Sequence, residues 1–208
     1  MIDADDDLDR IVLPMGASIR ASIARIDEAG RSDDEMTAEW ITDDECDSIE
    51  EQLGLAFVAA QTHITRVVSL CRRVHDLHES QVGSKSLLGI EGKKDQILAV
   101  KNTDILAIRG TPYTTVEGLN SFANYYKHRD EWPYDWTQLQ KNNEKQTAAV
   151  IEAFGAKPGS TGNLRQGYKG LFGDDDYANI GRLAEALAKW RSAIKEAYEE
   201  ELRKAGLL

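Results

Sequence analysis

The chain has 208 residues, of which 41% are hydrophobic and 29% charged, a balance typical of an ordinary soluble domain. Its formal net charge of −11 repels polyphosphate at long range, which disfavours a general nucleic-acid-coating role and suits a basic protein partner. No run approaches the ~20 apolar residues of a membrane span. The acidic N-terminus lacks a secretory layout, and two cysteines are too few for a disulfide framework, so a cytoplasmic location is expected.

The N-terminal residues 1–15 are acidic and aperiodic, and the pattern predicts a flexible tail. The remainder, residues 16–208, is expected to form a single helical domain. Its first element is a short helix at about 16–29, ended by Gly30.

The dominant element is a helix predicted over about 43–79. Thr42 as N-cap and Glu45 three residues later form a capping box at its start. A helix of about 35 residues would be about 50 Å long, which is typical of the spine of a helical bundle. Apolar side chains recur along it in alternating steps of four and three: Leu53, Phe57, Ala60, Ile64, Val67, Cys71 and Val74, with His78 in the same stripe.

Several shorter elements follow this helix. Residues 80–93 are interrupted by glycines and predict a loop, and residues 94–110 have helix-compatible spacing in two short pieces. Thr114 and Glu117 form a second capping box, which opens a helix through about Glu131. Asp135 and the residues after it predict the start of a helix ending at 154–155. Residues 156–173 predict a loop with at most one helical turn.

A long C-terminal helix is predicted over about 175–205, with the carboxylates of 174–176 in its first turn. Strand-like alternation is scarce, so the fold class is all-α, a helical bundle built on the two long helices. These helices could pair within one chain or with a second copy. The apolar stripe of the last helix consists of Ile180, Leu183, Leu187, Trp190, Ile194, Tyr198 and Leu202.

The end of the first long helix carries one candidate site. Arg73 and His78 could perform metal-independent RNA cleavage, with the imidazole moving a proton and the guanidinium holding the phosphate. Alternatively, His78 is a histidine at the edge of the core. Cys71, His75 and His78 could also hold zinc with His128 as a distant fourth ligand. Because no CxxC or HExxH motif is present, no metal and no cofactor are assigned.

The stretch ANYYKHRDEW, residues 123–132, carries the second candidate. Asn124 and His128 lie one helical turn apart on one stripe. The alternative is a polar helix end, where Lys127, His128 and Arg129 complement the dipole. Aromatic residues here could also wall a small-molecule pocket, namely Trp132, Trp136 and Tyr126. If the stretch docks a protein, the predicted binding surface is Tyr125, Lys127, Trp132 and Trp136.

The Asn124-x3-His128 pattern resembles the motif of HEPN-domain proteins, helical bundles whose active members carry Arg-x4–6-His, often with asparagine after the arginine. The arginine position of this motif is Ala123 here, while Arg73 to His78 matches the spacing but lacks the asparagine. The resemblance covers about residues 44–154. It implies a bundle that often dimerises, belongs to toxin–antitoxin or phage-defence settings, and either cleaves RNA or has lost that activity.

Two functions are therefore expected. The first is protein–protein association or self-association by a small HEPN-like bundle, which the acidic charge and Ala123 favour. The alternative is a metal-independent endoribonuclease. Its candidate catalytic residues are His128, Asn124, Arg73, His78, Arg109 and Arg129.

Overall fold

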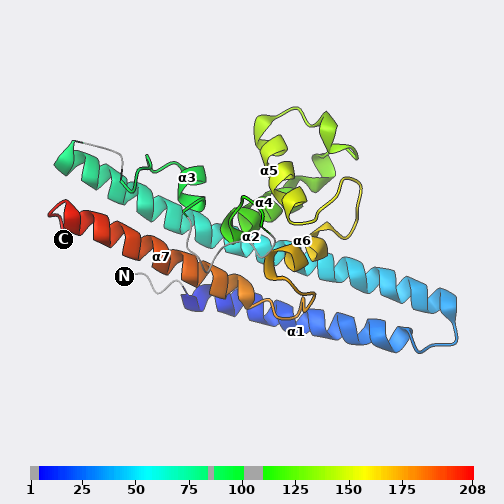
Figure 1. Cartoon of the computed structure of the whole chain (residues 1–208). Coiled ribbons are helices and arrows are strands. Elements are labelled where there is room, and N and C mark those ends of the chain that lie inside the picture. The colour runs from blue at the N-terminus through cyan, green and yellow to red at the C-terminus, as the bar shows by residue number, and fades with distance from the viewer. Residues whose placement is uncertain (1–4, 84–86, 101–109) are drawn as a thin grey trace.

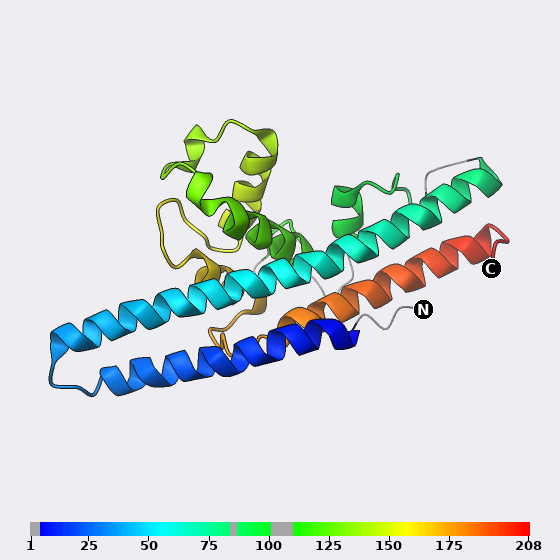
Figure 2. The ribbon, with the colours of Figure 1, turned by 180° about the vertical axis from the view of Figure 1, so that it is seen from behind.

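The computed structural model describes residues 5–83, 87–100 and 110–208, with side chains from residue 8 onward. Within these ranges the elements are helical, which confirms the all-α class. The long helix α2, Glu35–Val82, is the spine of the molecule. The helices α1, Asp5–Ala29, and α7, Arg182–Lys204, lie along it, as Figures 1 and 2 both show.

Helix α2 has 48 residues and extends about 72 Å at 1.5 Å per residue. It begins well before the predicted residue 43, because Asp34 is the N-cap and accepts a hydrogen bond from Thr37 N. The predicted cap, Thr42, instead donates its hydroxyl to the carbonyl of Ala38 inside the helix. Gly83, at φ 74°, ends the helix and donates its N–H to the carbonyl of Glu79.

Helix α1 corrects the prediction of a flexible tail for residues 5–15, whereas residues 1–4 of that predicted tail lie outside the described residues. It begins at Asp5 and continues through Pro14, so residues 5–15 are helical. Leu8, Val12 and Ile19 are buried at 5%, 0% and 0% exposure, and their burial against the bundle accounts for the extra helix. The chain then reverses at 30–34, and α1 runs antiparallel to the first half of α2 (Figure 1).

Helix α7 packs along the second half of α2. It begins at Arg182 and not near residue 175. The carboxylates of 174–176 precede it, and Asp174 forms an ion pair with Arg182. The predicted apolar stripe from Leu183 to Tyr198 is buried, and Tyr198 Oη lies 2.8 Å from His75 Nε2 of α2.

The shorter helices gather beside α2: α3, Lys94–Leu98; α4, Thr115–His128; α5, Asn142–Ala153; and α6, Asn163–Phe172. The capping box of Thr114 and Glu117 is present as predicted. The helix it opens ends at His128, and the 3-10 helix η2, Arg129–Glu131, follows it. Asp135 caps the 3-10 helix η3, Trp136–Gln138, so the predicted start of the next helix near Asp135 was wrong.

Helix α6 lies where the sequence predicted a loop. Its glycines permit close packing, since a Cβ on Gly167 would stand 2.2 Å from the Phe122 ring. The buried carboxylate of Glu50 accepts from the N–H groups of Leu164 and Arg165, at 2.9 Å each, and from Arg165 Nε at 3.0 Å. These bonds satisfy the free donors of the first turn of α6 and fix it to the middle of α2.

One described helix, α2, is long and apolar enough to cross a membrane by length and composition. Its most apolar 18-residue window has a mean hydropathy of 1.3, and 56% of that window is buried inside the protein. The core helix of a soluble protein can be equally apolar, and the stripe of α2 from Leu53 to Cys71 is buried here.

Candidate functional site

The structure brings Asn124 and His128 to one small cavity. The cavity has a volume of about 180 Å³ and lies between the end of α4, η2 and the beginning of α5. Lys141 and Glu144 also line the cavity. The remaining lining residues are Glu131, Trp132, Asn143 and Thr147.

The side chains of Asn124 and His128 both have polar partners within the protein. Asn124 Oδ1 accepts from Gln61 Nε2 of α2 at 2.7 Å, and Gln61 Oε1 accepts from Lys127 Nζ at 2.7 Å. The half-exposed imidazole of His128 has Nδ1 3.2 Å from Glu131 Oε1. Asn124 therefore joins α4 to α2, a structural role that accounts for its position on the stripe.

The cation of this cavity is a lysine. Lys141 Nζ lies 2.8 Å from Glu144 Oε1, and no arginine of the described residues lines the cavity. The guanidinium of Arg129 forms an ion pair with Glu51 and stands 4.9 Å from the centre of the Tyr126 ring. The predicted Arg109 lies outside the described residues. Within the described part of the chain, the arrangement lacks the phosphate-holding guanidinium of the nuclease hypothesis.

The second predicted pair does not come together on one face. Arg73 is exposed whereas His78 is 7% exposed, because residues five apart on an α-helix point about 140° away from each other. Cys71 and His75 are also buried, against Tyr198, and burial raises the pKa of the Cys71 thiol to about 11. Among the described residues, no three His, Cys, Asp or Glu side chains are placed to hold a metal ion.

The aromatic residues of the predicted binding surface pack against one another. Tyr125 and Trp136 are buried, at 9% and 7% exposure, and Trp132 is half-buried between them. The three rings stand edge to face, with centroids 5.4 to 5.8 Å apart. Of the four predicted surface residues only Lys127 is exposed. Of the three residues that the sequence suggested as pocket walls, only Trp132 lines the small cavity, since Trp136 is buried against the other rings and Tyr126 contacts Glu51 and Arg129.

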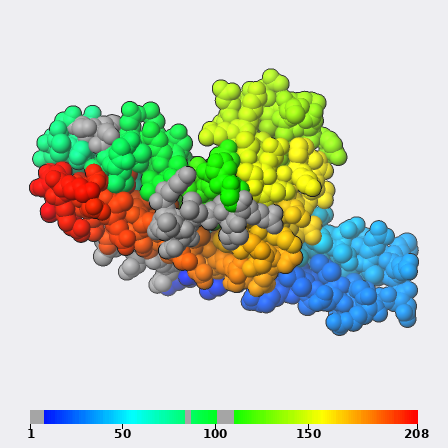
Figure 3. Space-filling view, in the orientation of Figure 1, coloured from blue at the N-terminus to red at the C-terminus, as the bar shows by residue number. Residues whose placement is uncertain are grey.

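A different surface, which sequence reasoning missed, presents apolar side chains to solvent. The end of α1, the turn and the start of α2, residues 24–47, form an arm that projects from the body (Figure 3). On this acidic arm Met36 and Trp40 are 79% and 69% exposed, and they lie one turn apart on the same face of α2. The arm also carries nine exposed carboxylates: Asp27, Glu28, Asp33, Asp34, Glu35, Glu39, Asp43, Asp44 and Asp47.

Few positive charges balance these carboxylates. The arm contains Arg25 and Arg31, and the guanidinium of Arg25 is bound to Glu45. The hydrogen bond from Arg25 is the main cause that lowers the pKa of the Glu45 carboxyl. The run of acids from 27 to 47 was visible in the sequence, but the exposure of Trp40 depends on which face of α2 packs against α1.

The geometry defines an elongated all-α bundle with a small polar cavity and an acidic, partly apolar arm. No protein-family model, no curated protein and no solved structure matches this chain.

Proposed function

We propose that this protein acts by binding another protein through the acidic arm, and that the partner supplies a Lys/Arg-rich segment. The observation that carries the proposal is the exposed pair Met36 and Trp40 on an arm that carries nine exposed carboxylates. Tryptophan is among the residues that contribute most to binding free energy at protein interfaces, and its indole face also attracts lysine and arginine side chains.

The negative charge of the arm argues against two other binding partners, a second copy of the chain and RNA. A second copy of the chain would bring a like-charged arm, which is repelled at close range. RNA would bring phosphates against the same carboxylates. A basic protein segment gains electrostatic attraction at a distance and buries the two apolar side chains on contact.

The resemblance to HEPN-domain proteins predicts the biological setting of such a partner, which is toxin–antitoxin function or phage defence. This setting stays a prediction. Loss of RNA cleavage with retained protein association is one form that the resemblance implies. Two observations agree with loss of RNA cleavage: the arginine position of the motif is Ala123, and the guanidinium of Arg129 is already in an ion pair.

The test is a titration with a synthetic Lys/Arg-rich peptide that carries interspersed leucines, followed through the tryptophan indole N–H signals by NMR. We expect the Trp40 signal to shift first, since Trp136 and Trp190 are buried and Trp132 is half-buried. Trp40→Ser with Met36→Ser should weaken binding about tenfold or more. An acidic peptide of the same length should not bind.

Two matched controls separate the arm from general charge attraction. Leu77 is 65% exposed at the far end of α2, so Leu77→Ser removes a comparable apolar side chain outside the arm. Charge reversal at Asp43 and Asp44 should weaken binding more than the same reversal at Glu152 and Glu196, which are exposed elsewhere. Equal losses from arm and control variants would refute the proposal.

A further inference from the structure

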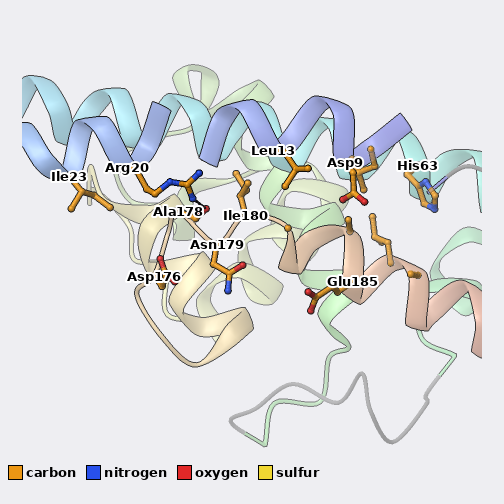
Figure 4. Close-up of a pocket in the computed structure, with 15 residues that line it drawn as sticks. Asp9, Leu13, Arg20, Ile23, His63, Asp176, Ala178, Asn179, Ile180 and Glu185 are labelled. Carbon is orange, nitrogen blue, oxygen red and sulfur yellow. Dashed lines mark hydrogen bonds between the residues drawn. The ribbon is translucent and has the colours of Figure 1, made fainter. Parts of the chain in front are cut away.

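A groove separates α1 from α7 where these two helices meet beside α2. It is lined by α1, the segment 176–181 and the first turns of α7, and His63 of α2 lies at one end (Figure 4). Its volume is about 830 Å³. This value falls within the roughly 300–1,000 Å³ of small-molecule sites in proteins.

The lining of the groove is mainly apolar. Ile180 and Leu187 are buried at 1% exposure and form its floor, and Leu13 of α1 lies along one wall at 58% exposure. Ala184 and Ala188 line the opposite wall, and these small side chains leave the space between the helices open. An apolar ligand would cover Leu13, which the protein leaves exposed to water.

The charged groups are unevenly placed along the groove. At one end Arg20 of α1 donates to the carbonyl of Ala178 at 3.5 Å, and Asp176 lines the same end of the groove (Figure 4). Toward the other end, Asp9 of α1 and Glu185 of α7 face the space from opposite walls (Figure 4). Within the described residues neither of these two carboxylates has an ion-pair partner.

We propose that this groove binds an elongated amphipathic organic cation. Its apolar part lies along Leu13, Ile180 and Leu187, and its cationic group lies between Asp9 and Glu185. The commitment to a cation follows from charge complementarity, since the two carboxylates would repel a fatty acid or another anion. This site is separate from the acidic arm, so the two proposals are tested independently.

Gly181 offers a way to narrow the groove without disturbing the fold. It lines the groove, its backbone is in the right-handed helical region at φ −57° and ψ −20°, and a Cβ placed there meets no atom within 4 Å. Gly181→Leu should therefore place an added apolar side chain in part of the groove. Gly16 is the opposite case, because a Cβ there would stand 2.6 Å from the carbonyl oxygen of Ala178.

The test compares three ten-carbon probes by isothermal titration calorimetry: decyltrimethylammonium and decanoate below their critical micelle concentrations, and decanol below its solubility limit. We expect one-to-one binding in the order cation, alcohol, anion. Asp9→Asn with Glu185→Gln should weaken the cation about five- to tenfold and leave the alcohol unchanged. Asp43→Asn with Asp47→Asn, an equal loss of charge on the arm, should change neither.

Gly181→Leu should weaken binding of all three probes. If that variant does not fold, the Asp9 and Glu185 pair of substitutions decides the question, since both side chains reach solvent. Equal affinity for the cation and the anion would overturn the proposal. Unchanged binding in Gly181→Leu would also overturn it. The same holds if the arm substitutions at Asp43 and Asp47 weaken cation binding as much as those at Asp9 and Glu185.

Discussion

Replacing Glu50 with alanine removes the carboxylate that holds α6 against α2. The side chain is 4% exposed and accepts three hydrogen bonds, from Leu164 N, Arg165 N and Arg165 Nε. Removal leaves two backbone donors and one guanidinium without this partner. Each unsatisfied buried group costs about 1–3 kcal/mol, and breaking a buried ion pair costs about 3–5 kcal/mol. Because Arg165 is only partly buried and reaches water, we expect a loss of about 3–5 kcal/mol in total.

The assay is equilibrium unfolding in urea, and the adjacent Glu51 provides the control. Its exposed carboxylate binds Arg129 and Tyr126 at the surface, so Glu51→Ala should cost less than about 1 kcal/mol. Glu50→Gln retains a carbonyl acceptor, and burial raises the pKa of Glu50, so the neutral amide should cost less than alanine. A loss below about 1 kcal/mol for Glu50→Ala, or equal losses at both positions, would refute the proposed role.

Two further predictions concern titratable groups. A thiol reagent at pH 8 should label the half-buried Cys46 in the native protein and Cys71 only after unfolding, because burial raises the pKa of Cys71 to about 11; mass spectrometry of the labelled peptides checks the assignment, and equal labelling rates would contradict it. The hydrogen bond from Tyr126 is the main cause that lowers the pKa of the Glu51 carboxyl below 4.5, with Arg129 contributing further. Its folded pKa therefore lies below the unfolded one, so its stabilising contribution is present above about pH 4.5 and is lost as pH falls through the folded pKa. By thermal unfolding, Glu51→Gln should be less stable than the wild type at pH 7, and the difference should shrink as the pH falls below about 4.5; a constant difference would exclude this linkage.

Local signals predicted some elements correctly. The capping box of Thr114 and Glu117 is present because both of its partners lie within four residues. A similar signal at Thr42 and Glu45 was misleading, since Asp34 caps the same helix earlier and no glycine or proline interrupts residues 35–42. A helix begins at the earliest satisfied cap that its packing allows.

The elements that were missed depend on partners far along the chain. The donors of α6 are satisfied by Glu50, which is separated from Leu164 by 114 positions, so its glycine-rich sequence alone resembles a loop. Leu8 and Val12 were hidden by the acidic run before them and by Pro14 after them. Their burial is a consequence of tertiary packing and not of local propensity.

In the candidate site, too, local spacing predicted some features, whereas others depend on how the helices pack. The placement of Asn124 and His128 on one stripe followed from helical spacing, and the cavity they share agrees with it. That Tyr125 is buried while Tyr126 reaches Glu51 could not be predicted, because it depends on how α4 is rotated against α2. The exposure of Trp40 was hidden for a similar reason.

The division of α2 between two companions has a kinetic consequence. Its first half pairs with α1 across a short turn, whereas its second half meets α7, where His75 and Tyr198 are 123 positions apart. Closing a long loop costs more chain entropy than closing a short one, and such distant contacts slow folding. The hairpin of α1 and α2 should therefore gain amide protection first in pulsed hydrogen exchange. The amides in the half of α2 that contains His75 should become protected only when α7 docks against it.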